Sequence, residues 1–193
     1  MADPGLPAGY PTGLRRRLRL RDRREVLVRP ILPSDAAELA EAFRRADPDT
    51  LYRRFLSGSP QVTERLLRHL TVVDYVRRLA LVAADAETGT GVAVARYEPQ
   101  GDGVAEVAVA VDPAWRRVGL ATALVELLAE AALDRGVHTF TVTYLAENRP
   151  VSSLVSGATG SGLRRIRDGI AECAIALDRD RVEAAVREFT PAA

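Results

Sequence analysis

The sequence contains no lysine, so all 27 of its basic residues are arginines. Lysine acetylation therefore cannot remove positive charge from this protein. Cys173 is the single cysteine, which excludes an intrachain disulfide and a zinc site built from cysteines. The two histidines, His69 and His138, lie far apart in the sequence, so we expect no metal site.

Long apolar runs are absent as well. No segment approaches the roughly 20 residues of a membrane-spanning helix, and the N-terminal arginines are not followed by the apolar stretch of a signal peptide. The net charge of +1 gives no global reason to expect nucleic-acid binding. We expect a cytoplasmic protein in which residues 1–13, rich in Pro, Gly and Ala, form a flexible tail and residues 14–193 form a single domain.

Apolar periodicity and turn residues predict an α/β domain. We expect these elements in order: a hairpin over 16–20 and 25–30, helices over 34–46, 48–56 and from 63, strands over 78–84, 91–97 and 104–111, a helix over 118–135, a strand over 138–145, a short helix after Asn148, a hairpin over 163–167 and 170–177, and a helix over 180–189. The crossover rule makes the strands over 104–111 and 138–145 parallel. The prediction is a mixed, mostly antiparallel twisted sheet with helices on both faces.

The most informative segment joins the strand over 104–111 to the helix that follows. Arg116, Arg117 and Gly119 stand where the strand gives way to the helix. The first N–H groups of a helix lack intrahelical partners, and the helix dipole favours negative charge there. Gly119 lets a phosphate approach the backbone closely, and the two arginines add positive charge. We therefore expect this segment to bind a pyrophosphate.

The same segment resembles the signature of the Gcn5-related N-acetyltransferase (GNAT) family, Gln/Arg-x-x-Gly-x-Gly/Ala, read here as Arg116-x-x-Gly119-x-Ala121. The order of elements is also similar to the GNAT fold. The resemblance implies acetyl-CoA as co-substrate, with its pyrophosphate on the loop and its pantetheine on a splayed end of the preceding strand. The cofactor-binding residues that it implies are Val109, Ala110, Val111, Arg116, Arg117, Val118, Gly119, Leu120, Ala121, Thr122 and Asn148.

Further segments are similar to bacterial protein lysine acetyltransferases, including catalytic domains of those fused to cyclic-nucleotide-binding domains. Spread over roughly residues 24–150, they are VLVRPI at 26–31, LYRRF at 51–55, VVDY at 72–75, VARY at 94–97, AEVA at 105–108 and LAENRP at 145–150. This likeness implies that the acceptor is a protein lysine. The oligomeric state is left open, with a homodimer as one option.

Glu106 is the candidate catalytic base. An amine must lose a proton before it can attack a thioester, and a lysine has a pKa of about 10.4 in solution, so a carboxylate must take that proton directly or through water. Glu106 interrupts the apolar alternation of the strand that should carry the cofactor, and its position matches the glutamate of the bacterial lysine acetyltransferases. The alternatives are a solvent-facing glutamate and an ion-pair partner of Arg96 on the adjacent strand.

The helix after Asn148 departs from the family pattern, because it carries serine and glycine where a tyrosine often protonates the leaving thiolate. Ser153 and Ser156 are the substitutes that the sequence offers. Two further hypotheses therefore stay open: a non-catalytic acyl-CoA-binding regulatory module, and an acetyltransferase for a small cationic amine such as an aminoglycoside or polyamine. An acidic cleft would favour the latter, and the candidates for it are Asp47, Asp49, Glu64 and Asp74.

Two smaller questions also stay open at this point. The arginine-rich turn at residues 21–24 fits a solvated strand face, or a surface for an acidic partner or nucleic acid. Trp115 precedes the arginine pair and fits a place beside the adenine of CoA or one under the loop.

Overall fold

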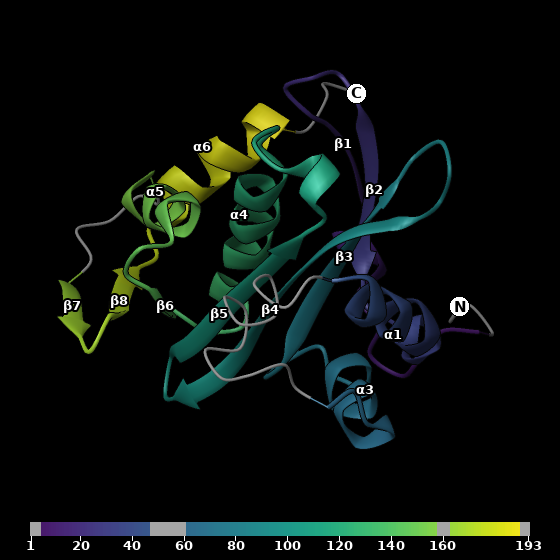
Figure 1. The fold of residues 1–193 in the computed structure, drawn as a ribbon, viewed down its shortest axis with the longest axis horizontal. Helices are drawn as coiled ribbons and strands as arrows, with labels where there is room; N and C mark the ends of the chain where they lie inside the picture. Colours follow the sequence, from purple (N-terminus) through teal and green to yellow (C-terminus); the bar gives the residue numbers. More distant parts are fainter. Residues whose placement is uncertain (1–4, 47–60, 158–162, 190–193) are drawn as a thin grey trace.

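The computed structural model describes residues 5–46, 61–157 and 163–189 (Figure 1). Eight strands form one sheet in the order β1-β2-β3-β4-β5-β6-β8-β7. The strands are β1 (Arg16–Arg19), β2 (Glu25–Pro30), β3 (Leu79–Asp85), β4 (Gly91–Gly101), β5 (Val104–Val111), β6 (Thr139–Leu145), β7 (Leu163–Arg167) and β8 (Ile170–Ala176). The helices are α1 (Ala36–Arg45), α3 (Glu64–Thr71), α4 (Leu120–Leu133), α5 (Arg149–Gly157) and α6 (Arg179–Phe189).

The pairing of the strands confirms the predicted mixed sheet. Every neighbouring pair is antiparallel except β5 and β6, which are parallel and are connected through α4. Both predicted hairpins are present, β1–β2 and β7–β8, and the second turns at Asp168 and Gly169, which both have a positive φ. Turns of that backbone conformation match the twist of antiparallel strands.

Helices cover both faces of the sheet, as predicted. Tyr97 on β4 and Val107 on β5 are register partners, and they share a core cluster with Leu124 of α4. Arg96, which precedes Tyr97 on β4, points to the opposite face, where its guanidinium donates to the carbonyl of Leu70 in α3. Because successive side chains of a strand point to opposite faces, α3 and α4 lie on opposite sides of the sheet.

The helix α4 lies between the sheet and α6, which runs across it in Figure 1. Val182 and Val186 of α6 are buried in the same core cluster as α4. The sequence of α4, LATALVELLAEAAL, is apolar on most of its circumference because most of its circumference is covered. This burial holds the N-terminus of α4 rigidly next to the end of β5.

The strands β5 and β6 are paired over three residues only. Their partners are Val104 with Thr139, Ala105 with Phe140, and Glu106 with Thr141. Beyond Glu106, β5 continues beside β4 alone, so an opening separates it from β6 in the described part of the sheet. The divergence that the family resemblance implied is therefore present.

The backbone of β5 is directed into this opening at alternate residues. The N–H of Asp112 donates to the carbonyl of Val92 on β4. Since the N–H and C=O groups of successive strand residues point to opposite sides, those of Val109 and Val111 point away from β4. Those of Ala110 point toward β4, where Ala110 is the register partner of Val94.

The N-terminal segment corrects the expectation of a flexible tail up to residue 13. Tyr10 is 9% exposed, its hydroxyl donates to the carbonyl of Pro30, and its ring meets the edge of Tyr75 at 5.4 Å. One aromatic ring anchors a segment whose composition otherwise resembles a tail. The predicted helix over 48–56, with Tyr52 and Phe55, lies outside the described residues.

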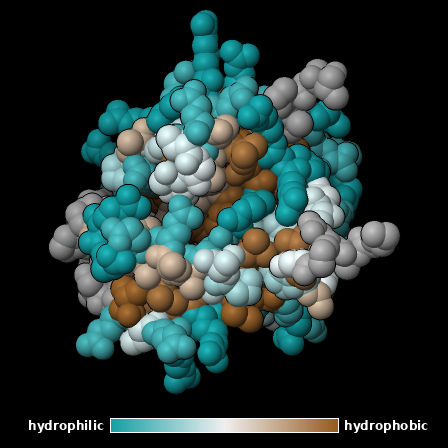
Figure 2. Space-filling view, turned by 90° about the vertical axis from the view of Figure 1, so that its right-hand side faces the viewer, coloured by the Kyte–Doolittle hydropathy of each residue, from teal (hydrophilic) through white to brown (hydrophobic). Residues whose placement is uncertain are grey.

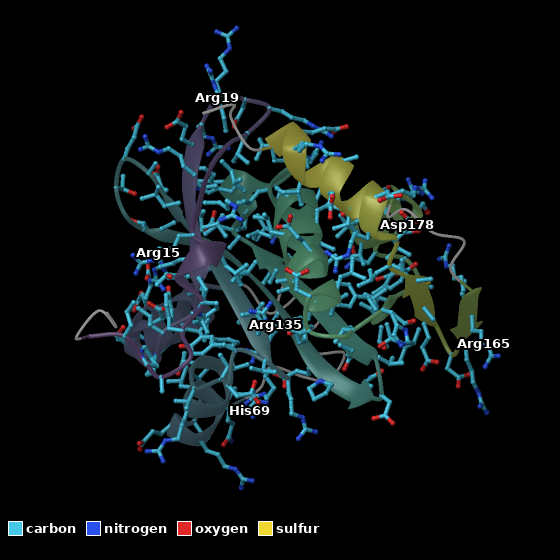
Figure 3. The ribbon with its side chains drawn as sticks, turned by 180° about the vertical axis from the view of Figure 1, so that it is seen from behind. Arg15, Arg19, His69, Arg135, Arg165 and Asp178 are labelled. Atoms are coloured by element: carbon cyan, nitrogen blue, oxygen red, sulfur yellow. The ribbon has the colours of Figure 1, made fainter. Side chains whose placement is uncertain are left out.

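The two edge strands of the sheet are rich in arginine. Arg16, Arg17 and Arg19 lie on β1, and Arg164, Arg165 and Arg167 lie on β7. Figure 3 shows Arg19 and Arg165 projecting away from the body of the protein. Charged side chains on an edge strand hinder its pairing with other chains, so the arginines of β1 and β7 protect both edges of the sheet.

Hydrophobic side chains reach the surface in places, and Figure 2 shows some of them within a frame of hydrophilic residues. The large hydrophobic residues that are exposed in the described part are Leu27, Val62, Val72, Val76 and Ile166. No helix of the described residues combines the length and the apolar character needed to cross a bilayer.

Candidate functional site

The segment between β5 and α4 has two residues with a left-handed backbone. Arg117 has a φ of 62°, and Gly119, the N-cap of α4, has a φ of 92°. Left-handed positions within a turn direct neighbouring N–H groups to one side and so create an anion-binding concavity. The dipole of α4 adds positive potential at the same place. The loop is therefore suited to a pyrophosphate.

Gly119 leaves open space that a side chain would take. A Cβ atom at this position would lie 3.4 Å from the ring of Phe189 and 3.6 Å from the Nε of Arg21. An approach of a ligand to the backbone at Gly119 thus depends on the absence of a side chain. The close approach of a phosphate that the sequence predicts at Gly119 stays a prediction.

The side chains of the loop have different surroundings. Arg116 and Arg117 are exposed, and the Nε of Arg116 donates to the carbonyl of Val111 at 3.2 Å. Leu120 is 1% exposed, so its side chain anchors the helix and only its backbone faces the loop. Val118, Ala121 and Thr122 are half-buried. The predicted loop residues are thus brought together, with cations outside and an apolar anchor inside.

The turn between β1 and β2 supports this loop from a distant part of the chain. The N–H of Arg21 donates to the carbonyl of Val118 at 3.2 Å. The guanidinium of Arg24 stacks over the ring of Trp115, 3.9 Å from its centroid, and donates to the carbonyl of Ala114 at 3.0 Å. Trp115 is 8% exposed, so it packs under the loop and is not available to an adenine ring.

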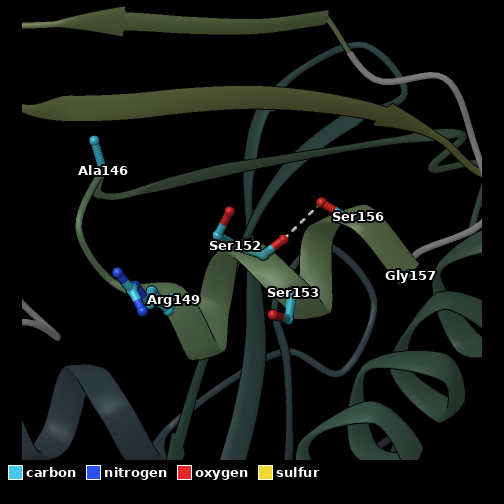
Figure 4. Close-up of a pocket in the computed structure, with 6 residues that line it drawn as sticks. All are labelled: Ala146, Arg149, Ser152, Ser153, Ser156 and Gly157. Atoms are coloured by element: carbon cyan, nitrogen blue, oxygen red, sulfur yellow. Dashed lines mark hydrogen bonds between the residues drawn. The ribbon is translucent and has the colours of Figure 1, made fainter.

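Two cavities flank α5. The larger, of about 500 Å³, is drawn in Figure 4 and is lined by Ala146, Arg149, Ser152, Ser153, Ser156 and Gly157. The smaller, of about 300 Å³, lies between α4 and α5 and is lined by Arg21, Thr122, Val125, Glu126, Ser153, Leu154 and Gly157. Ser153 and Gly157 line both cavities. The smaller cavity borders the first turns of α4, directly beyond the loop.

Asn148 has a structural role at the start of α5. It is 7% exposed, and its Oδ1 accepts a hydrogen bond from the N–H of Val151 at 3.4 Å. Its carbonyl accepts from the N–H of Ser152. A buried side chain that caps the helix fixes the direction in which α5 leaves β6. The predicted contact between Asn148 and pantetheine stays a prediction.

The serines of α5 differ in how their hydroxyl groups are used. Ser156 donates to the carbonyl of Ser152 at 2.9 Å, as the dashed line in Figure 4 shows. Ser153 points to the other side of the helix from Ser152. Tyr144 lies beneath α5 on β6, but it is 2% exposed and its hydroxyl meets the sulfur of Cys173 at 3.9 Å. Of these hydroxyls, that of Ser153 is best placed to face a ligand.

Glu106 stands at the last paired position of β5 and β6, where the opening begins. Its side chain lies on the face of the sheet that α3 covers, opposite to the face of Val107. Its Oε2 accepts from the amide of Gln100 at 3.4 Å, and the Oε1 of Gln100 accepts from the hydroxyl of Thr141 at 2.7 Å. A half-buried carboxylate is thus held beside the backbone of β5 that has no partner in β6.

The expected alternative, an ion pair between Glu106 and Arg96, is wrong. Arg96 is 5% exposed and donates to Glu98 at 2.7 Å and to the carbonyl of Leu70 at 3.1 Å. Arg78 donates to the same Glu98 at 2.6 Å. Burial lowers the pKa of Arg96. Burial alone would raise the pKa of Glu98, but the hydrogen bond from Arg78 and the charge of Arg96 bring it below its usual value.

We expect Arg96→Met to lower the free energy of unfolding by about 3 kcal/mol, because it leaves the carbonyl of Leu70 without its donor and Glu98 with one cation fewer. The matched control is Arg78→Met, which removes a cation from the same carboxylate at a site where 21% of the side chain is exposed. This control should lose clearly less. Urea unfolding followed by circular dichroism measures both, and equal losses would contradict the importance of burial.

Two of the four acidic residues that could attract a cationic acceptor, Glu64 and Asp74, lie in the described part of the chain. The side chain of Glu64 is 90% exposed, and Asp74 accepts hydrogen bonds from the N–H groups of Val76 and Arg78 at 2.9 Å. Asp47 and Asp49 lie outside the described residues. In the described part of the chain, no group of three or more His, Cys, Asp or Glu side chains could hold a metal ion.

Glu126 is a buried acid that sequence analysis missed. It lines the smaller cavity, is 8% exposed, and makes no hydrogen bond or ion pair with any residue that the structure describes. Burial and then the charge of Glu188 on α6 raise its pKa above the usual value. Only the position of α6 across α4 reveals this burial, because the helical pattern leaves Glu126 on a mixed face.

We expect Glu126→Gln to raise Tm by a few degrees at pH 7–8. The pKa of Glu126 is raised in the folded state, so the folded protein binds more protons than the unfolded chain, and stability falls as pH rises from the unfolded pKa of about 4.3 through the folded one. Glutamine does not titrate, so the variant keeps its stability as pH rises. The difference in Tm between variant and unmodified protein should vanish below about pH 4, where Glu126 is protonated in both the folded and the unfolded state. Glu188→Gln should give a smaller gain of the same sign. Calorimetric scans from pH 4 to 8 test this, and a gain independent of pH would contradict it.

Comparisons with known proteins agree with this geometry. Residues 39–154 match the model of the acetyltransferase (GNAT) family. Acetyltransferase Pat of Mycolicibacterium smegmatis is 30% identical over 130 residues, which cover 66% of this chain and 39% of that protein. Acetyltransferase PA5475 of Pseudomonas aeruginosa is 30% identical over 138 residues, which cover 70% of this chain and 74% of that protein. The chain thus spans less than half the length of the first of these relatives.

Solved structures are similar over most of the chain. The GNAT domain of S. lividans PAT has a TM-score of 0.80 and 29% identity, and the match covers 87% of this chain and 99% of that one. Mycobacterium smegmatis RimJ in complex with CoA-disulfide has a TM-score of 0.68 and 18% identity, covering 91% and 95%. At 18% identity the likeness shows the fold alone.

Proposed function

Because this chain belongs to the GNAT family of acetyltransferases, we propose that it transfers the acetyl group of acetyl-CoA to the side-chain amine of a protein lysine. A cytoplasmic location is part of the same proposal. The observation that carries it is the position of Glu106, a carboxylate at the mouth of the opening into which the backbone of Val109 and Val111 points.

The proposed binding of acetyl-CoA uses three parts of the site. The loop around Gly119 holds the pyrophosphate with its N–H groups, and Arg116 and Arg117 add charge. The backbone groups of Val109 and Val111 hold the pantetheine arm, because they have no partner strand on that side. Asn148 fixes the start of α5 on the far side of the opening.

Glu106 is proposed as the general base. It takes one proton from the acceptor amine, directly or through a water molecule, and the freed nitrogen forms a bond to the acetyl carbon. The carbon–sulfur bond breaks, and the thiolate takes a proton from water. Even a cysteine thiol has a pKa of about 8.5 in solution, so an alkyl thiolate is protonated readily at neutral pH. Gln100 positions Glu106 through the hydrogen bond to its Oε2.

The charges on the face of the sheet that carries Glu106 favour a protein lysine over a small polycation as acceptor. Arg78 and Arg96 neutralise Glu98. Of the described acidic candidates, Glu64 is exposed and Asp74 accepts hydrogen bonds from the backbone. A polyamine or an aminoglycoside carries several positive charges and would need an acidic cleft. A lysine side chain brings a single charge, and the surface around it supplies further contacts.

A thiol-release assay tests this proposal. The purified protein is given acetyl-CoA with lysine-containing peptides or protein, with spermidine, or with an aminoglycoside. Release that requires a lysine acceptor supports the proposal, and release with spermidine or an aminoglycoside alone would replace it with a small-amine acetyltransferase. Binding of CoA without release on any acceptor would favour a regulatory module. Since the chain has no lysine, every acetyl-lysine that is detected comes from the acceptor.

A further inference from the structure

Three strands of the sheet are joined by side chains where the opening between β5 and β6 begins. Glu106 on β5 and Thr141 on β6 are register partners at the last paired position of these two strands. Gln100 lies on β4, on the other side of β5. Its Oε1 accepts from the hydroxyl of Thr141 at 2.7 Å, and its Nε2 donates to the Oε2 of Glu106 at 3.4 Å. The side chain of Gln100 therefore crosses β5 and connects the candidate base to β6.

Gln100 reaches this far because it lies in a bulge of β4. In the pairing of β4 with β5, Pro99 is the partner of Ala105, and Gly101 is the partner of Val104. Gln100, which stands between Pro99 and Gly101, is the additional residue of β4. Such a residue bends its strand and changes the direction of a side chain, and bulges are common next to active sites. The bulge thus places an amide beside the carboxylate of the opening.

The hydroxyl of Thr141 determines which way the Gln100 amide faces. An ionised carboxylate only accepts hydrogen bonds, so the amide must turn its NH₂ group to Glu106. Thr141 selects this orientation because its hydroxyl donates to the oxygen of the amide. The carbonyl of Ala105, at 3.5 Å from the same hydroxyl, is too far away to compete for its proton.

The bond to Thr141 is needed because Gln100 is exposed. A long exposed side chain keeps much of its rotamer freedom unless a bond holds it. The bond of 2.7 Å to Thr141 therefore stabilises the longer bond of 3.4 Å to Glu106. Catalytic hydrogen bonds are often long without substrate and shorten when the substrate binds.

We propose that Thr141 is a positioning residue for acetyl transfer, which fixes the amide of Gln100 and thereby holds the carboxylate of Glu106 toward the acceptor amine. This inference rests on the proposed function, since it assumes that Glu106 is the base. Thr141 acts through Gln100 and contributes no atom to the reaction. Without its hydroxyl the carboxylate of Glu106 gains freedom to turn, and a small misplacement of a catalytic group lowers the rate.

Steady-state kinetics of the full chain with acetyl-CoA and a lysine-containing peptide test the proposal. Thr141→Val keeps nearly the same shape, and we expect kcat to fall about three- to tenfold, the effect of one lost hydrogen bond. KM for acetyl-CoA should not change, because the proposed contacts of acetyl-CoA lie on the loop before α4 and on the backbone of β5. Thr141→Ser keeps the hydroxyl and should restore kcat to within about twofold of the unmodified protein.

The matched control is Thr139→Val, which makes the same replacement two residues earlier on the same face of β6. Thr139 is half-buried like Thr141, and its hydroxyl lies 3.4 Å from the Nδ1 of His138, away from Gln100. This control should leave kcat unchanged. Tm should not fall in either valine variant, because valine is at least as favourable as threonine in a strand.

A double variant tests whether Thr141 acts through Gln100. Gln100→Leu should lower kcat by a factor similar to that of Thr141→Val, and the two replacements together should lower it no further, because each breaks the same chain of hydrogen bonds. Losses that multiply in the double variant, or equal kcat values of Thr141→Val and Thr139→Val, would overturn the inference. An unmodified protein without turnover on lysine peptides would instead overturn the proposed function, so the two failures are distinguishable.

Discussion

Replacing Glu106 with glutamine is expected to lower kcat for acetyl transfer by about 10²- to 10⁴-fold, the usual contribution of a general base. Glutamine has nearly the same shape but cannot take a proton from the amine. Affinity for CoA should not change, because the proposed contacts of CoA lie on the loop and on the backbone of Val109 and Val111. Steady-state kinetics and titration with CoA measure the two effects separately.

A matched control for this variant is Glu172→Gln, which removes an exposed carboxylate from β8 of the same sheet. It should leave both kcat and CoA affinity unchanged. Unchanged turnover in Glu106→Gln would remove Glu106 from the role of base. Loss of CoA affinity together with turnover would show that Glu106 acts through the structure of the opening.

Gly119→Ala is expected to weaken CoA binding about tenfold or more, because an added Cβ takes the space through which a phosphate reaches the backbone N–H groups. The left-handed backbone at this residue also costs about 1–2 kcal/mol of stability for any residue with a Cβ. A control variant must therefore separate the effect of backbone strain at residue 119 from the effect of losing the space for a phosphate.

Gly136→Ala provides that separation. Gly136 lies just beyond the other end of α4, has a φ of 78°, and has no atom within 4 Å of an added Cβ. Both variants should lose similar stability in thermal unfolding, and Gly119→Ala alone should lose affinity for CoA in titration. An equal, small effect of both variants on CoA affinity would contradict a ligand approach at Gly119.

Much of the fold was predictable because its signals are local. The alternation of Val26 and Val28, the glycine after α4 and the turn at Asp168 and Gly169 each lie within a few residues. The predicted tail was wrong because Tyr10 is held by Pro30 and Tyr75, which stand 20 and 65 positions away. No property of residues 1–13 alone contains that contact.

The candidate site divides in the same way. Glu106 and the loop at 116–122 lie in one strand–loop–helix segment, where the chain itself keeps them close. Sequence analysis considered Glu106, on the next strand, as a partner of Arg96 and missed Glu98, which lies two residues away on the same strand. Register places Glu98 opposite Glu106, and α3 buries Arg96 against Leu70. The choice was made by the packing of a helix onto the sheet.

The sequence by itself determined the order of the elements and the position of the arginine- and glycine-containing loop at the start of α4, because periodicity, turn residues and helix starts act over a few neighbouring positions. It also determined that the chain offers no lysine as an acetyl acceptor. Only the tertiary structure decided that β5 and β6 separate beyond Glu106, that Arg21 lies over Gly119, and that α6 buries Glu126. These contacts join segments far apart in the chain, and their energy comes from burial and backbone hydrogen bonds that exist only when the sheet and α4 are assembled.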